Sequence, residues 1–442
     1  MMGISNIIFI LLLIAGISLF IINAKKIRRN ILLGKPVNRN DKKGERWKLM
    51  TLVALGQKKM FQRPVPALLH LFVYIGFVLI NIEVLEMFID GIFGTHRFLS
   101  FLNFENFLLY DIMIGSFEAL AFFVTLGCLL FLIRRNIIRV KRLVMKDLNG
   151  WPKTDANLIL IAEVFIMSSL FIMNTADQVL QQMGSEHYNH AGNFPITQFL
   201  IPLFSGINEA TLILIERSAW WFHIFGVLWF LNYLVISKHL HIILAFPNVF
   251  YSNLNPKGQF TNLGSVTNEV KAMLDPSFTP SEPINPNQPM RFGAKDVFDL
   301  SWKQLLDAYT CTECGRCTSA CPANQTGKLL SPRKIMMDTR DRLEEVGKNI
   351  DKNKQFVDDG KSLFSNYISA EELWACTSCN ACVQECPVNI DPLSIIIDIR
   401  RYLVMEQSAA PQSINMMATN IENNGAPWQY SPSDRLNWAN EQ

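Results

Sequence analysis

The sequence predicts an all-α protein in two parts: a membrane bundle of about five transmembrane helices, followed by a mostly α-helical, cysteine-rich domain. Half of the 442 residues are apolar, which is too hydrophobic for an ordinary soluble protein of this length. The apolar residues are concentrated in residues 1–246, and eight of the nine cysteines lie in two short clusters beyond them. The ninth, Cys128, lies in an apolar run and is expected to be a small core residue.

Five stretches are long and apolar enough to cross a hydrocarbon core, which takes about 20 helical residues. They cover residues 4–23, 65–89, 105–133, 157–180 and 208–237. The first stretch could be a cleaved signal peptide. No basic segment precedes it and no small-residue cleavage site follows it, so we expect a retained span.

Basic residues are distributed unevenly among the loops. Segments 24–63 and 134–153 contain thirteen and seven Lys or Arg residues, whereas loops 90–104 and 181–207 contain only Arg97. Loops rich in Lys and Arg stay on the cytoplasmic side. The sequence therefore predicts a multi-pass protein of the cytoplasmic (inner) membrane, with the N-terminus outside and the C-terminal domain in the cytoplasm.

Histidines in the bundle predict a b-type haem, which can be ligated between facing helices. His70 lies near the cytoplasmic end of the second span, and three more histidines lie on the fifth span and its extension: His223, His239 and His241. On one continuous helix His223 and His241 share a face ~27 Å apart, and His239 faces elsewhere. His70 and His241 are therefore the predicted axial pair, and a second haem would need another partner for His223. The alternative is that each histidine is only a hydrogen-bonding group.

Other polar residues of this region have weaker interpretations. Three histidines fall in the outer loops and are expected at the surface: His96, His187 and His190. Three carboxylates fall within the spans: Glu83, Glu118 and Glu163. Carboxylates inside a membrane are costly and often mark proton or quinone paths, although each could instead pair with a polar neighbour.

The cysteines form two motifs of the form C-x2-C-x2-C-x3-C-P, which begin at Cys311 and Cys376. Three cysteines at this spacing bind one [4Fe–4S] cluster, and in two-cluster ferredoxins the fourth binds the other cluster. The predicted ligand sets are Cys311, Cys314, Cys317 and Cys386 for one cluster, and Cys376, Cys379, Cys382 and Cys321 for the other. Zinc is usually bound by two CxxC pairs and does not explain the two C-x3-C-P endings. Thiolates kept reduced fit a cytoplasmic location.

The composition divides the chain into four segments. Residues 1–246 form the transmembrane haem-binding bundle, 247–294 an extended Pro-rich linker, 295–406 the two-[4Fe–4S] ferredoxin-like helical domain, and 407–442 a C-terminal tail expected to dock a partner. The linker prediction depends on five prolines whose spacing blocks a helix: Pro276, Pro280, Pro283, Pro286 and Pro289.

Two capping signals predict helices around the cysteine motifs. Ser331 and Asp391 each precede a proline at the first helical position. The resulting helices, about 332–348 and 392–405, are expected to pack together and shield the clusters, and a third at about 295–309 leads to the first motif. Neither a nucleotide-binding glycine motif nor a basic patch interleaved with aromatic residues occurs, so nucleic acid is not an expected partner.

The bundle, with WWFH at 220–223 and SKHLHI at 237–242, resembles the gamma-subunit family of respiratory nitrate reductase. The resemblance implies bis-histidine haem ligands on the second and fifth spans, at His70, His223 and His241, and electron exchange with a menaquinone or ubiquinone pool. The nitrate reductase form has a further histidine ten residues after the first, where this chain has Ile80.

The C-terminal half resembles the iron–sulfur part of heterodisulfide-reductase-like proteins, in the segments 299–317 and 420–441. In fused relatives the second segment leads into cysteine-rich CCG domains, so the resemblance implies a split form whose CCG domains lie on a separate partner subunit. It also suggests an electron-transfer flavoprotein or a 2-hydroxy-acid dehydrogenase as electron donor.

These patterns predict a membrane electron-transfer subunit of a quinone-linked oxidoreductase that is not catalytically complete alone. Electrons would pass between a cytoplasmic partner, two [4Fe–4S] clusters, b-type haem and a quinone, in either direction. The alternative is a ferredoxin-type membrane assembly or maturation factor for a respiratory oxidase, which need not bind haem. A third hypothesis, a redox sensor, leaves the five spans and the histidine pair unexplained.

Overall fold

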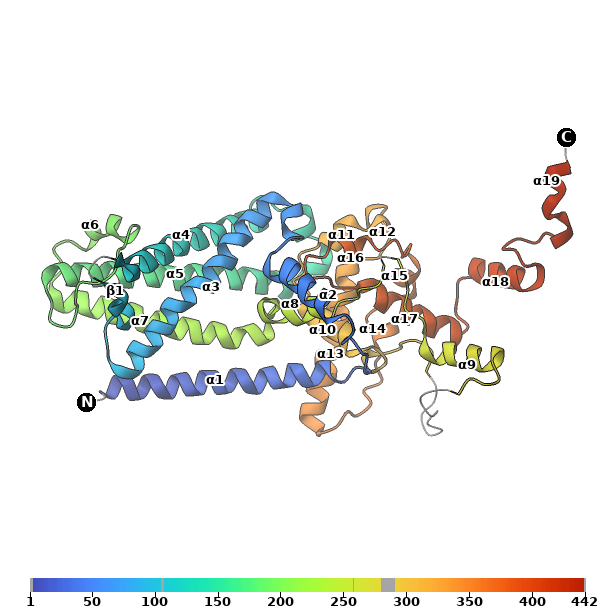
Figure 1. The fold of residues 1–442 in the computed structure, drawn as a ribbon, viewed down its shortest axis with the longest axis horizontal. Helices are drawn as coiled ribbons and strands as arrows, with labels where there is room; N and C mark the ends of the chain where they lie inside the picture. Colours follow the sequence, from blue (N-terminus) through green and yellow to red (C-terminus); the bar gives the residue numbers. More distant parts are fainter. Residues whose placement is uncertain (1–2, 105–106, 257, 280–290, 441–442) are drawn as a thin grey trace. The chain divides into compact units, whose positions relative to one another are not determined.

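The computed structural model describes residues 3–104, 107–256, 258–279 and 291–440 (Figure 1). The chain divides into two compact units. Unit 1 contains Met1–Arg29, Trp47–Phe250 and Thr312–Gly315, and unit 2 contains Asn30–Arg46, Tyr251–Cys311 and Arg316–Gln442. The bundle predicted at 1–246 differs from unit 1 in three respects. Residues 30–46 group with unit 2, whereas residues 247–250 and the short segment 312–315 of the first cysteine motif group with unit 1.

Unit 1 is almost entirely helical. Its α-helices are α1 (Ile4–Ile31), α2 (Lys43–Met50), α3 (Pro64–Phe93), α4 (Leu109–Asn136), α5 (Trp151–Met183), α6 (Ile201–Phe204), α7 (Glu209–Tyr233) and α8 (His241–Phe250). A two-residue antiparallel pair, β1 (Asn103–Phe104) and β2 (Phe107–Leu108), precedes α4. Short 3-10 or π turns join the helices: η1 (Thr51–Leu55), η2 (Met60–Gln62), η3 (Phe98–Leu102), η4 (Lys141–Leu143), η5 (Lys146–Leu148), η6 (Thr197–Phe199), η7 (Leu234–Ile236) and η8 (Lys238–Leu240).

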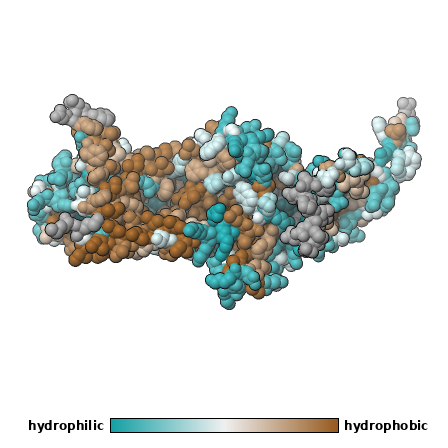
Figure 2. All heavy atoms as spheres, turned by 60° about the horizontal axis from the view of Figure 1, so that its bottom comes forward, coloured by the Kyte–Doolittle hydropathy of each residue, from teal (hydrophilic) through white to brown (hydrophobic). Residues whose placement is uncertain are grey.

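Five of these helices, within the described residues, are long and apolar enough to cross a membrane: α1, α3, α4, α5 and α7 with its η7 extension. The five spans predicted from the sequence are thereby confirmed. Large apolar side chains stand exposed on them, such as Ile4 at 79% and Leu11 at 62% on α1. Figure 2 shows hydrophobic residues covering most of these helices on the face drawn. Such a surface would be unstable in water but matches a hydrocarbon environment.

Spanning helices that follow one another in the chain pack together: α3 against α4, α4 against α5, and α5 against α7. Helix α1 contacts them at several points, including two on α7. Phe9 packs with its ring centroid 5.5 Å from that of Trp220 on α7. Farther along, Asn232 Nδ2 donates to the Gly16 carbonyl (3.0 Å). These contacts order a helix that is otherwise exposed along most of its length.

The fifth span does not continue as one helix to His241. Helix α7 ends at Tyr233, and Ser237 adopts an extended conformation (φ −118°, ψ 150°) before η8 and α8. Asp155 of α5 stabilises the break by accepting from the Tyr233 hydroxyl (2.6 Å), the Ser237 hydroxyl (2.7 Å) and the Lys238 amide (3.1 Å). The expectation that His223 and His241 share one continuous helix face is therefore wrong.

Unit 2 consists of short helices around the cysteine motifs. They are α9 (Gly264–Leu274), α10 (Trp302–Thr310), α11 (Arg316–Ala320), α12 (Pro322–Gln325), α13 (Pro332–Asn353), α14 (Leu363–Asn366), α15 (Ala370–Trp374), α16 (Ala381–Glu385), α17 (Pro392–Met405), α18 (Gln412–Asn424) and α19 (Asn437–Asn440), with 3-10 turns η9 (Val297–Asp299) and η10 (Pro432–Leu436).

Both predicted helix caps are present. The Ser331 hydroxyl accepts from the Lys334 amide (3.3 Å), and the Asp391 carboxylate accepts from the Ser394 amide (3.0 Å). The helices that they begin, α13 and α17, pack against each other as expected. Arg342 lies on the other side of α13 with no exposed side-chain surface and forms ion pairs with Asp296 (2.8 Å) and Asp359 (2.6 Å). This network fixes the segment before α10 to the long helix.

Two features of unit 2 differ from the sequence-based expectation. Residues 30–46, expected to be a loop of the bundle, pair with the start of α10: the Lys35 amide donates to Leu300 O (2.7 Å), and the Trp302 amide donates to Lys35 O (3.1 Å). The linker at 247–294, expected to be extended, contains helix α9. Pro276 follows that helix in a turn, whereas Pro280, Pro283, Pro286 and Pro289 lie outside the described residues.

Candidate metal and cofactor sites

The two cysteine motifs adopt the same backbone conformation. The residue before the second cysteine has positive φ in both motifs, at Glu313 (57°) and Ser378 (57°). The residue after the second cysteine does as well, at Gly315 (71°) and Asn380 (64°). Left-handed residues on both sides of a cysteine turn the backbone tightly around it. A tight turn at the second cysteine of each motif suits the closely spaced thiolates that a [4Fe–4S] ligand motif needs.

The fourth cysteine of the first motif lies with the second motif. Helices α11 and α16, which follow the two loops, pack against each other. Cys321 is close enough to both Cys376 and Cys382 to raise the pKa of their thiols, although burial is the larger cause at each, and Cys379 acts on Cys376 in the same way. The four side chains proposed for the second cluster therefore lie in one neighbourhood, as crossed ligation requires.

No three His, Cys, Asp or Glu side chains among the described residues surround a position for a single metal ion. A [4Fe–4S] cluster poses a different requirement, because each of its thiolates binds a different iron atom. Among the described residues the cysteines form no disulfide. Two C-x2-C-x2-C-x3-C-P motifs are the thiolate set that two [4Fe–4S] clusters require.

Polar groups around the second motif suit a negatively charged cluster. Two amides point at sulfur atoms, Ser378 N at Cys376 Sγ (3.4 Å) and Ile390 N at Cys386 Sγ (3.3 Å). Arg400 of α17 donates to the Cys376 carbonyl (2.5 Å). Hydrogen bonds and positive charge near cluster sulfurs raise the reduction potential.

Within unit 1, the segment 312–315 is held by two cations of the bundle. Lys238, which is 7% exposed, forms an ion pair with the buried Glu313 and donates to Pro152 O (2.6 Å). Arg142 donates to the Cys314 carbonyl. Burial lowers the pKa of Lys238, and the negative charges of Glu313 and Asp155 oppose that effect. The loop that carries a proposed cluster ligand is thereby tied to the residue before His239.

Replacing Lys238 with methionine is expected to lower the reduction potential of one cluster by tens of millivolts, because a buried positive charge beside its loop is lost. The Lys238→Met/Glu313→Gln double variant removes the charge pair together and should bring the potential back toward that of the wild type. A redox titration followed by electron paramagnetic resonance measures both. Equal shifts in the single and double variants would contradict the electrostatic explanation.

The structure brings three of the predicted histidines together near the end of unit 1 that holds 312–315. The ring centroids of His239 and His241 are 5.5 Å apart. Burial lowers the pKa of His239 to about 3, and His241 and His70 contribute further to this shift. The sequence-based argument that His239 faces away is wrong, because it assumed an unbroken helix.

His223 lies apart from this group, 1% exposed inside the bundle. Its Nδ1 lies 3.0 Å from Ile166 O and 3.3 Å from the Ser169 hydroxyl. His241 uses its Nδ1 in the same way, 3.1 Å from Lys238 O. A histidine that donates Nδ1–H to a carbonyl presents Nε2 for another partner, which is the usual arrangement of a metal-ligating imidazole. Each residue therefore has the orientation that a haem-ligating imidazole needs, and each would supply Nε2 to the iron of a different bound haem.

A buried ion-pair cluster occupies the opposite end of unit 1. Arg97 forms ion pairs with Asp177 (2.9 Å) and Glu83 (3.1 Å). His96, expected at the surface, has a side chain only 8% exposed and contacts Asp177, whereas His187 and His190 are exposed as expected. Arg97 was visible in the sequence as the single basic residue of two loops, which was the available signal for this cluster.

The other intramembrane carboxylates have different surroundings. Glu118 accepts from the Ile196 amide (2.7 Å) and from the Thr197 hydroxyl. Glu163 has an electrostatic interaction with Cys128, which is buried as expected. Glu83 is thus the predicted carboxylate that belongs to a larger charged group.

Fold and site together define a helical membrane protein with an iron–sulfur unit. Residues 310–390 match the family model of the 4Fe-4S dicluster domain, which supports two [4Fe–4S] clusters in this chain. The matched segment contains both cysteine motifs and none of the five spans.

Relatives with curated names are oxidoreductases or a membrane-anchored ferredoxin. The chain is 27% identical, over 98% of its length, to the probable iron-sulfur-binding oxidoreductase FadF of Bacillus subtilis. It is 25% identical, again over 98% of its length, to EtfAB:quinone oxidoreductase of Syntrophomonas wolfei. A shorter match, 34% identical over 33% of this chain and 24% of the relative, is to a probable membrane-anchored ferredoxin of Chromohalobacter salexigens. These names support an electron-transfer component of an oxidoreductase.

The chain spans 60% of the length of the Bacillus relative and 59% of the Syntrophomonas relative. Over 27% of its own length it is also 32% identical to one subunit of a CoB-CoM heterodisulfide reductase of Methanosarcina acetivorans, covering 60% of that protein. No solved structure matches the chain.

Proposed function

We propose that this chain is the membrane electron-transfer subunit of a quinone-linked oxidoreductase. Electrons would pass between a cytoplasmic partner, the two [4Fe–4S] clusters, a b-type haem and a quinone. The observation that carries the proposal lies within unit 1: segment 312–315 of the first cysteine motif is bound at Lys238, the residue directly before His239. The proposed cluster ligand Cys314 and the histidines at 70, 239 and 241 thus lie at the same end of the bundle.

The proposed orientation follows from the basic loops. Segments 24–63 and 134–153 carry twenty Lys or Arg residues. Arg142 of the second segment donates to the Cys314 carbonyl, so this segment lies at the end of the bundle that holds 312–315. That end is proposed to face the cytoplasm of a cell with this protein in its inner membrane. The Arg97–Asp177 end is then proposed to face outside.

A cytoplasmic partner is proposed to dock on the C-terminal tail. The tail exposes four large apolar side chains, each more than half exposed: Trp428, Tyr430, Leu436 and Trp438. Exposed apolar clusters of this kind mark interaction surfaces. The proposed occupant is a CCG-domain subunit, with an electron-transfer flavoprotein or a 2-hydroxy-acid dehydrogenase as donor. The name of the Syntrophomonas relative, EtfAB:quinone oxidoreductase, supports the electron-transfer flavoprotein as donor.

A reduced-minus-oxidised optical spectrum of the purified protein, with iron and haem quantified per chain, tests the proposal. We expect about eight non-haem iron atoms, the total of two cubanes, and one or two b-type haems that a quinol analogue reduces. Eight iron atoms without haem would overturn the quinone pathway and favour the membrane maturation factor. Two haems would mean that His223 has a ligand partner in addition to the group at His70.

A further inference from the structure

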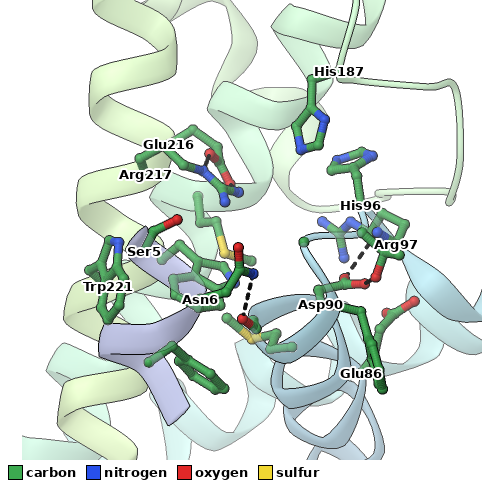
Figure 3. Close-up of a pocket in the computed structure, with 18 of the residues that line it drawn as sticks. Ser5, Asn6, Glu86, Asp90, His96, Arg97, His187, Glu216, Arg217 and Trp221 are labelled. Carbon is green, nitrogen blue, oxygen red and sulfur yellow. Dashed lines mark hydrogen bonds and ion pairs between the residues drawn. The ribbon is translucent and has the colours of Figure 1, made fainter. Parts of the chain in front are cut away.

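A cavity of about 500 Å³ lies at the end of unit 1 where α1 and α7 begin and α3 and α5 end. Figure 3 shows His96, Arg97 and Asp90 on one side of it and Glu216, Arg217 and Trp221 on the other. The lining therefore combines residues from four spanning helices and the loop after α3. The cavity lies inside the bundle, and its residues are distant in sequence from the cysteine motifs. Neither the clusters nor the histidine group at His70 therefore accounts for it.

The cavity has an apolar part and a polar part. Six large apolar side chains line it: Phe9, Met87, Phe93, Met173, Trp220 and Trp221. Facing them are two cations and several carboxylates, of which Glu216 pairs with Arg217. A flat aromatic molecule with polar oxygens at its edge fits such a lining, because its ring can pack on the indoles while its oxygens meet the polar groups.

His96 has a buried nitrogen without a partner. Its Nε2 lies 2.9 Å from Asp177 Oδ1, and Nδ1 is buried with no hydrogen-bond partner in the described structure. A carboxylate can only accept, so Nε2 carries the hydrogen, and Nδ1 of the neutral ring is an acceptor. An unpaired buried acceptor costs free energy. A ligand that donates a hydrogen bond to Nδ1 would remove that cost.

Arg97 positions the histidine through Asp177. Its Nε and Nη2 donate to Asp177 Oδ2 (3.0 and 2.9 Å), which leaves Oδ1 for His96. Arg97 is itself fixed by Glu83 (3.1 Å) and by Asn174 Oδ1 (2.7 Å). The carboxylate thus holds the imidazole in one tautomer and would stabilise the imidazolium after proton uptake.

We propose that this cavity binds the headgroup of a quinol and that His96 Nδ1 accepts the proton of one quinol hydroxyl. The inference rests on the proposed function, and its electron acceptor would be a b-type haem held by His223, because His70 and His241 lie at the opposite end of unit 1. The hydroxyl O–H bond breaks and an Nδ1–H bond forms, and the second quinol proton goes to solvent. The two electrons that the quinol loses in becoming the quinone would be taken up by that haem, which supplies one-electron chemistry when bound. Quinone reduction is the same sequence reversed. Trp220 lies one helical turn from His223 on α7, so the bound headgroup would lie near His223.

The test uses the purified holoprotein and two naphthoquinone probes. Photolabelling with an azidonaphthoquinone, mapped by mass spectrometry, is expected to mark peptides of this cavity. Menadiol, the reduced naphthoquinone, serves to measure the initial rate of haem reduction. His96→Gln keeps a hydrogen-bonding side chain but cannot carry the proton. It should retain labelling and haem content while the rate falls by about 10²-fold or more, the usual contribution of a general base.

Two further variants separate chemistry from folding. His190→Gln changes an exposed histidine outside the cavity lining and is expected to leave both labelling and rate unchanged. Ser5→Phe fills the cavity from α1 without touching His96 and should reduce labelling. Labelling elsewhere, or an unchanged rate in His96→Gln, overturns this inference alone. A wild-type protein that lacks haem, or whose haem menadiol does not reduce, overturns the proposed function first.

Discussion

Replacing Cys321 with alanine is expected to remove the cluster of the second motif and to leave that of the first, so that iron falls from about eight to about four atoms per chain. The reason is spatial: Cys321 follows the first motif in sequence but neighbours Cys376 and Cys382 of the second. Iron analysis together with electron paramagnetic resonance of the reduced protein measures the loss. Cys128→Ala, at a buried cysteine in the bundle, is the matched control and should keep all eight iron atoms.

Double variants show which cluster each cysteine serves. If Cys321 and Cys379 bind the same cluster, the Cys321→Ala/Cys379→Ala protein retains about four iron atoms, as each single variant does. If crossed ligation holds, Cys321→Ala/Cys314→Ala loses both clusters and nearly all its iron. The reverse pattern, with the 314 pair retaining four atoms, would mean that each motif binds its own cluster with all four of its cysteines.

The cysteine motifs were predictable because their information is local. Spacing determines which thiolates can face one cluster, and Ser331 and Asp391 act on amides three residues away. A prediction that depends only on neighbouring residues does not depend on how the rest of the chain folds. The same reasoning explains the five spans, since length and hydropathy are properties of each segment by itself.

The histidine geometry was harder to predict because it depends on contacts distant in sequence. The break at Ser237 is stabilised by Asp155, 82 residues earlier, and nothing in the local sequence requires it. Helical periodicity therefore placed His239 on the wrong face. Likewise, the burial of His96 depends on Asp177 of another helix, and the pairing of Lys35 with Leu300 is invisible to any local pattern.

Replacing the bundle histidines one at a time is expected to separate haem ligands from neighbours. His70→Leu and His241→Leu should each abolish the b-type haem, with loss of at least about nine-tenths of its absorbance, because a bis-histidine site fails when either axial bond is missing. His239→Leu is the matched control, since its ring stands beside that of His241 with centroids 5.5 Å apart. Haem per chain and iron per chain are measured together, and iron should stay at about eight in all three.

The variants that lose haem show whether His239 or His241 is the ligand. His241 is the expected ligand because its Nδ1 is directed to the Lys238 carbonyl, which orients Nε2 for iron. Haem loss in His239→Leu with retention in His241→Leu would transfer that role to His239. His223→Leu adds the last distinction: unchanged haem would leave a single site at the His70 end, whereas loss of one haem out of two would place a second beside Trp220 and the proposed quinol cavity. In that case electrons would have a cofactor at each end of the bundle, as transfer across the membrane requires.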